Sequence, residues 1–155
     1  MLEVLYEDNH LIAINKKSGD IVQGDKTGDA PLSDFVKAYI KKKYNKPGEV
    51  FLGTIHRLDR PTSGIVLYAR TSKALTRMNE QFREKQVQKT YWAVVDNMPP
   101  NISGTLESYL QKNQKQNKSY ITKGAEGKQS YKGTYEEDKK HNIDTEEQTN
   151  ISKNK

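Results

Sequence analysis

The chain has no cysteine, only three histidines and a single tryptophan among its 155 residues. Without cysteine it can form neither disulfide bonds nor thiolate metal sites. His10, His56 and His141 lack the spacing of metal ligands, so no metal is expected. No apolar run approaches the length of a membrane span or of a signal-peptide core, which predicts a cytoplasmic protein with no membrane partner.

Apolar residues and positive charge are also unevenly distributed. Only 33% of the residues are hydrophobic, which is low for a globular domain, and the net charge is +6. A basic body suits a polyanionic partner such as RNA. From Glu136 onward the only apolar residues are Ile143 and Ile151, and acidic residues outnumber basic ones. We therefore expect one domain over residues 1–135 and a polar, acidic, disordered tail over residues 136–155.

The most informative stretch is a polar turn between two apolar runs, residues 52–71, which reads LGTIHRLDRPTSGIVLYART. The apolar runs predict strands, and Pro61 followed by Thr-Ser-Gly predicts a turn between them. Asp59 lies between Arg57 and Arg60, whose positive charges are expected to lower its pKa and keep it ionised. An ionised carboxylate on a loop at a strand edge can act as a nucleophile or as an electrostatic anchor, or it can simply cap the turn.

The other segments predict a mixture of short strands and two helices. Strands are expected at residues 4–6, 11–14, 65–69, 88–95 and 105–110, and helices at residues 31–43 and 72–85. Asp29 or Ala30 is expected to cap the first helix, with Pro31 suited to its first turn, and Ser72 is expected to cap the second. The first helix ends in a run of lysines, which suits either a solvated, dipole-matched helix end or a patch that contacts phosphate.

Three motifs resemble those of a known family. HRLDRPTSG, which begins at His56, closely resembles the H-R-L-D-x-x-T-S-G signature of RluA-type RNA pseudouridine synthases. Near the N-terminus, NKKSG resembles the family's N-K-P-x-G, with Lys17 in place of proline. The segment from Lys89 to Val95 resembles the family's second motif, K-x-Y-x-A-x-V. The resemblance implies an α+β fold with a mixed, mainly antiparallel sheet and flanking helices, similar to the N-terminal half of the pseudouridine synthase catalytic domain.

The resemblance also implies a reaction and its residues. Family members isomerise uridines in rRNA or tRNA to pseudouridine without a cofactor. Asp59 corresponds to the catalytic aspartate, acting either by covalent attack or by taking a proton from the ribose. Tyr91 corresponds to the active-site tyrosine that lies against the uracil. Arg57 could fill the space of the flipped-out base, and Arg60 could contact phosphate. The full set of predicted RNA-binding residues is Arg57, Arg60, His56 and Thr62.

The family's third motif, an H-T-G-R-x-H-Q-I-R-like segment that supplies a basic partner for the aspartate, has no match. Arg83 is the last arginine of the chain. Two interpretations therefore remain open: an active RNA pseudouridine synthase, and a truncated, inactive remnant that still binds RNA through its basic body. No segment predicts a particular oligomeric state.

Overall fold

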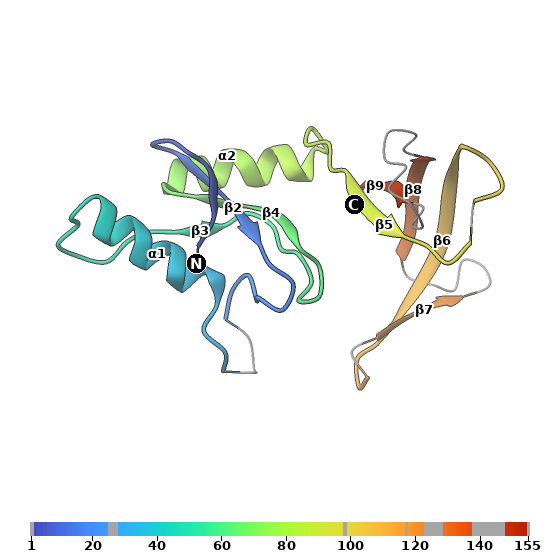
Figure 1. Cartoon of the computed structure of the whole chain (residues 1–155), viewed down its shortest axis with the longest axis horizontal. Coiled ribbons are helices and arrows are strands. Elements are labelled where there is room, and N and C mark those ends of the chain that lie inside the picture. The colour runs from blue at the N-terminus through green and yellow to red at the C-terminus, as the bar shows by residue number, and fades with distance from the viewer. Residues whose placement is uncertain are drawn as a thin grey trace. The chain divides into compact units, whose positions relative to one another are not determined.

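The computed structural model describes residues 2–24, 28–97, 99–116, 118–122, 129–137 and 148–154. The chain divides into two compact units, Met1–Glu84 and Lys85–Lys155. The elements follow in the order β1 (Val4–Glu7), β2 (Leu11–Lys16), α1 (Leu32–Lys43), β3 (Gly53–Thr54), β4 (Gly64–Ala69), α2 (Ser72–Arg83), β5 (Tyr91–Val94), β6 (Ser103–Asn113), β7 (Lys118–Thr122), β8 (Gln129–Glu137) and β9 (Gln148–Asn154). Figure 1 traces these elements along the chain.

The first unit is built on an antiparallel sheet with the strand order β1-β2-β4-β3, called the first sheet below. In its central pair, Ile12 lies opposite Tyr68 and Ile14 lies opposite Val66. Because side chains alternate between the two faces of a strand, these four share one face. That face is buried against α1, through side chains that include Val36.

The opposite face of the first sheet is covered by α2, which contacts β3 and β4 (Figure 1). A Cβ atom built on Gly53 would lie 2.8 Å from Cδ2 of Leu75, so any larger residue would force the Leu75 side chain to move. Gly53 lies opposite Ala69, on the face away from α1. The first unit therefore has three layers, with the sheet between its two helices.

Both predicted helices are confirmed, with a correction at the start of each. The N-cap of the first is Pro31 and not Asp29 or Ala30, because Pro31 keeps an extended backbone and Leu32 is the first helical residue. The first runs from Leu32 to Lys43 and keeps its lysines in the last turn. The second is preceded by Thr71, whose hydroxyl accepts a hydrogen bond from the backbone N–H of Ala74. Thr71 therefore caps this helix and Ser72 is its first residue, because Thr71 keeps the extended backbone that an N-cap needs.

The second unit contains an antiparallel sheet with the strand order β5-β9-β8-β6-β7. β5 covers the centre of the strand predicted at residues 88–95, and β6 extends the one predicted at 105–110 at both ends. Together the helices and antiparallel sheets confirm the predicted α+β class.

The structure differs from the expected disordered tail at β9, Gln148–Asn154. This strand pairs with β5 on one side and with β8 on the other. Backbone hydrogen bonds to two neighbours can order a segment whose side chains supply little apolar surface, and apolar content was the basis of the prediction. Residues 138–147 of the expected tail lie outside the described residues.

Neither of the two helices described has the length and apolar character needed to cross a membrane.

Candidate active site

Asp59 lies on the loop between β3 and β4, which we call the aspartate loop, residues 55–63. The side chain of Leu58 packs against the core of the first unit, whereas that of Asp59 is exposed. The backbone N–H of Thr62 donates to the carbonyl of Asp59 at 3.0 Å and closes a turn. Gly64 follows with a φ of +134°, a conformation that side-chain-bearing residues rarely adopt. The loop therefore turns Asp59 outward while Leu58 anchors it.

The side chain of Lys16 fixes the backbone of this loop through hydrogen bonds. Its side chain is fully buried at the end of β2, on the same face as Ile12 and Ile14. Its Nζ donates hydrogen bonds to the carbonyl of Lys17 at 3.1 Å, of Arg60 at 3.0 Å and of Thr62 at 2.6 Å. Two of the three carbonyls thus belong to the aspartate loop, on the C-terminal side of Asp59.

The ammonium of Lys16 also sits in the field of two carboxylates. Burial lowers its pKa, and the negative charges of Asp20 and Asp59 oppose this effect. Lys16 is therefore a cation close enough to Asp59 to interact with it electrostatically. The role of Lys16 was not predicted from the sequence. The signal that could have indicated it is a lysine at an inward-facing position of a strand that otherwise buries isoleucines.

Arg60 does not flank the Asp59 carboxylate as the sequence suggested. Its Nη2 lies 2.8 Å from Oδ2 of Asp29, and both side chains are about half exposed. Arg57 is exposed on the same loop. Among the described residues, no cationic nitrogen lies within 4.0 Å of the Asp59 carboxylate. The pairing was not predicted, because the sequence marked Asp29 only as a possible helix cap and gives no sign that it lies near Arg60.

His56 joins the start of the aspartate loop to two other elements. Its Nε2 accepts a hydrogen bond from the backbone N–H of Leu67 at 3.1 Å. Its ring stacks on Phe82 of α2, with centroids 5.3 Å apart and planes inclined by 18°. Because Nε2 accepts, the neutral ring carries its proton on Nδ1. These contacts position the loop, and a contact of His56 with RNA stays a prediction.

Thr62 contributes to the loop through its backbone, which both donates to Asp59 and accepts from Lys16. Its side chain is partly buried. A contact of this side chain with RNA stays a prediction.

Tyr91 lies in the second unit, at the start of β5, opposite Ile151 of β9. Its side chain is partly buried, whereas Trp92 and Val94, on the other face of the strand, are 51% and 64% exposed. The structure thus describes the two predicted catalytic residues in separate units, and the catalytic role of Tyr91 stays a prediction.

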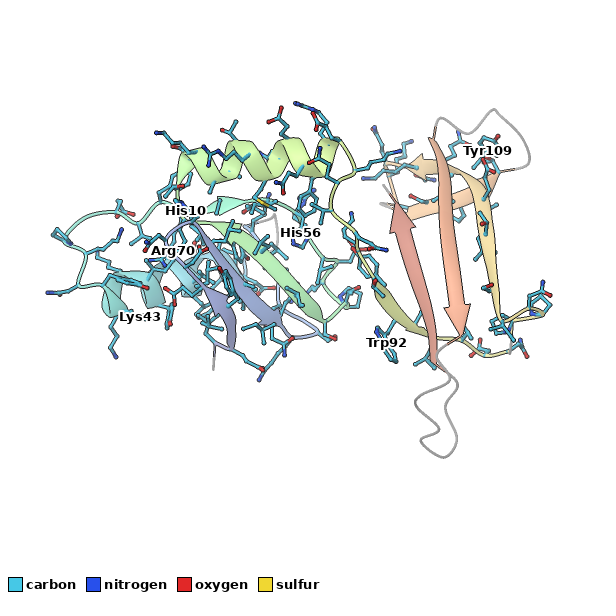
Figure 2. All side chains as sticks on the ribbon, turned by 90° about the horizontal axis from the view of Figure 1, so that it is seen from above. His10, Lys43, His56, Arg70, Trp92 and Tyr109 are labelled. Carbon is cyan, nitrogen blue, oxygen red and sulfur yellow. The ribbon has the colours of Figure 1, made fainter. Side chains whose placement is uncertain are left out.

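A second ionic cluster lies at the other end of the first sheet, around Glu7. Its carboxylate accepts from Lys43 at 2.7 Å, from the hydroxyls of Tyr44 and Tyr39 at 2.7 and 3.0 Å, and lies 3.0 Å from a guanidinium nitrogen of Arg70. Burial alone would raise the pKa of Glu7, but the hydrogen bonds from Lys43, Tyr44 and Tyr39 lower it overall. Figure 2 shows Lys43 and Arg70 at this end and His56 away from them. All of these contacts of Glu7 stabilise the fold, so we assign it a structural role.

No group of three or more His, Cys, Asp or Glu residues with the arrangement of a metal site occurs in the part of the chain that the structure describes.

Comparison of the sequence with known proteins identifies a family that the chain matches. The family model described as RNA pseudouridylate synthase matches residues 10–153. The chain is 37% identical over 126 residues to ribosomal large subunit pseudouridine synthase C of Buchnera aphidicola subsp. Schizaphis graminum, covering 81% of this chain and 38% of that protein. It is 44% identical over 95 residues to tRNA pseudouridine synthase C of Haemophilus influenzae, covering 61% of this chain and 38% of that protein.

A solved structure shares the fold. The human RNA pseudouridylate synthase domain containing 4 aligns with a TM-score of 0.75 at 21% identity, over 99% of this chain and 59% of that one. The chain spans about 38% of the length of the two bacterial relatives named above. Because the family model covers most of the chain, including the aspartate loop and Tyr91, the chain belongs to the RNA pseudouridylate synthase family.

Proposed function

We propose that this chain isomerises uridine to pseudouridine in ribosomal RNA or tRNA, in the cytoplasm, with Asp59 as the catalytic residue. The observation that carries the proposal is the aspartate loop, which exposes Asp59 while Lys16 fixes the backbone behind it. Two kinds of relative, one named for ribosomal RNA and one for tRNA, support these two substrate classes.

The reaction moves one bond. The bond between ribose C1′ and uracil N1 breaks, the detached uracil turns, and C1′ bonds to C5. The proton on C5 is lost to solvent and N1 takes up a proton, so the product is an isomer and no redox partner is needed. The Asp59 carboxylate either attacks C1′ and leaves again when C5 bonds to C1′, or removes a proton from the ribose at the start and returns it after the new bond has formed. In both routes an exposed, rigidly held carboxylate is required.

The other residues serve the RNA. Uridine must leave the helical stack before its sugar is accessible. The exposed guanidinium of Arg57, two residues before Asp59, is suited to stack in the space left by the flipped base. Tyr91 is proposed to lie against the uracil once both units engage the RNA. Lys16 supplies positive charge behind Asp59 and holds its loop.

The experiment is tritium release from RNA labelled at uracil C5, using the full chain with bulk tRNA and ribosomal RNA. Wild-type protein is expected to release tritium, and Asp59→Asn is expected to reduce release to background. Asp34→Asn is the matched control, because it makes the same change in charge at an exposed position in the first turn of α1. Release that persists in Asp59→Asn would overturn the role of Asp59.

A second candidate function is RNA binding without turnover. The observation that favours it is the positive net charge of the chain, +6, which suits a polyanionic partner whether or not turnover occurs. If wild-type protein retains RNA on a filter but releases no tritium, this second function replaces the first. If it neither retains RNA nor releases tritium, both are overturned.

A further inference from the structure

The ion pair between Arg60 and Asp29 joins the aspartate loop to the segment that leads into α1. The guanidinium Nη2 and carboxylate Oδ2 are 2.8 Å apart. The two side chains are 50% and 53% exposed, so water and larger anions can reach both partners. Arg60 directly follows Asp59, which makes this guanidinium the cation nearest in sequence on the C-terminal side of the candidate catalytic residue.

The backbone of Arg60 is fixed without help from this ion pair. Its carbonyl accepts from Nζ of Lys16 at 3.0 Å and from the backbone N–H of Gly19 at 2.9 Å. The Asp59–Thr62 turn holds the neighbouring residues. Loss of the Asp29 carboxylate should therefore leave the loop in place and change only the direction and the electrostatic surroundings of the Arg60 guanidinium.

Asp29 lies two residues before Pro31, the N-cap of α1, and the start of this helix is tied to the preceding segment. The backbone N–H of Leu32 donates to the carbonyl of Ile21 at 2.7 Å, and that of Ser33 donates to Val22 at 3.3 Å. Pro31, the N-cap residue, has no side-chain capping bond, so the helix start is fixed by these backbone contacts. Asp29 thus lies close to a fixed helix start and is not the N-cap, so its carboxylate is available to Arg60.

We propose that Asp29 is an intramolecular competitor for the site on Arg60 that takes an RNA phosphate. This inference rests on the proposed function, in which the aspartate loop binds RNA. A carboxylate and a phosphate accept hydrogen bonds from the same donors of a guanidinium. In the free protein Asp29 occupies one of these donors and neutralises the charge. RNA binding then requires either exchange of the carboxylate for phosphate or a repulsive approach of phosphate to Asp29.

The exposure of the pair makes exchange feasible. Half-exposed ion pairs contribute little free energy, because water already solvates both partners. A phosphate in a polyanionic chain gains more, since its contact also releases condensed counterions. Asp29 thus moderately lowers the affinity of the protein for any RNA. Contacts other than that of Arg60 must then supply a larger part of the binding free energy.

The experiment measures the affinity of the full chain for a fluorescently labelled, unmodified tRNA transcript over a series of salt concentrations. Asp29→Asn preserves the shape of the side chain and removes its charge. We expect it to tighten binding about two- to fivefold at low salt, in line with the modest strength of exposed pairs, and to steepen the salt dependence by about one released ion. Arg60→Gln should weaken binding, and the gain from Asp29→Asn should vanish in the double variant.

Asp34→Asn is again the matched control, since it adds the same net charge without a partner on the aspartate loop, and it should tighten binding much less. Thermal unfolding of each variant establishes that it is folded, and Asp29→Ser provides a second removal of the carboxylate. Unchanged or weaker binding in both Asp29 variants overturns the inference, as does a gain that persists beside Arg60→Gln. A wild-type chain that binds no RNA overturns the proposed function and this inference together.

Discussion

The two ends of the first sheet treat a buried charge in opposite ways. At one end Glu7 is surrounded by charged and phenolic side chains, including Lys43 and Arg70. At the other end, within the described part of the chain, the hydrogen bonds of the Lys16 side chain all go to backbone carbonyls. A charge that neighbouring side chains neutralise joins the elements that carry those side chains, and it has little electrostatic effect beyond them. A charge solvated by carbonyls fixes the loop that carries those carbonyls, and its field still reaches Asp59.

The largest expected effect comes from breaking the Glu7 end. Glu7→Gln removes the negative charge and leaves Arg70, whose side chain is only 9% exposed, without its carboxylate. Removing one partner of a buried ion pair costs about 3 kcal/mol or more. Chemical denaturation followed by the helical circular dichroism signal measures this, since both described helices belong to the first unit.

The control for this prediction is Glu80→Gln, in an exposed pair with Arg83 at 3.5 Å. It should change stability by less than about 0.5 kcal/mol. Equal effects of the two substitutions would contradict the view that the Glu7 end stabilises the unit.

Removing the Lys16 ammonium should destabilise the protein less than Glu7→Gln does, and it should reduce activity more. Lys16→Met keeps the volume of the side chain but leaves the carbonyls of Arg60 and Thr62 without their buried donor, at about 2–3 kcal/mol. The N–H of Thr62 should exchange faster with solvent, and tritium release should fall. Lys17→Met, at an exposed neighbour, serves as the control. Normal release by Lys16→Met would show that the loop does not depend on this lysine.

A smaller effect is expected from the backbone at the end of the aspartate loop. Gly64 has a φ of +134°, and alanine there should cost about 1–2 kcal/mol through strain. Gly48→Ala is the control, because a Cβ at Gly48 meets nothing within 4 Å. Comparing the two by denaturation separates strain from a general effect of added methyl groups. A loss no larger at Gly64 than at Gly48 would count against the strain.

The smallest expected effect is a loss of stability at acidic pH that comes from Glu7. Folding lowers the pKa of Glu7, so it stabilises the ionised form. This stabilisation is present above the unfolded-state value of about 4.3 and is lost as the pH falls through the lower folded-state value. Wild-type protein should therefore lose more stability than Glu7→Gln between neutral and acidic pH. Parallel losses in both proteins would assign the acid sensitivity to other groups.

The regular elements could be predicted from the sequence because their patterns are local. Ile12 and Ile14 mark one face of a strand, and the spacing of Leu32, Val36 and Ile40 marks one face of a helix. Asp59 was found because its signature is contiguous. Such patterns need no knowledge of distant residues.

The site's supporting contacts could not be predicted, because they join segments that are distant in sequence. The bonds from Lys16 to Arg60 and Thr62 span 44 and 46 positions. The pairing of Arg60 with Asp29 depends on how the start of α1 is tied to Ile21. β9 was missed for a different reason: its order comes from backbone pairing on both sides, which leaves no apolar pattern.

The strand orders of the two sheets also set the order in which the chain can fold during its synthesis. Every pairing of the first sheet lies within Met1–Glu84, so the aspartate loop can form as soon as that segment has left the ribosome. The strand of Tyr91 pairs with β9, in a register that sets Tyr91 opposite Ile151. The nascent chain can therefore complete the aspartate loop early, whereas β5, which carries Tyr91, gains its partner β9 only after Gln148–Asn154 has also been made.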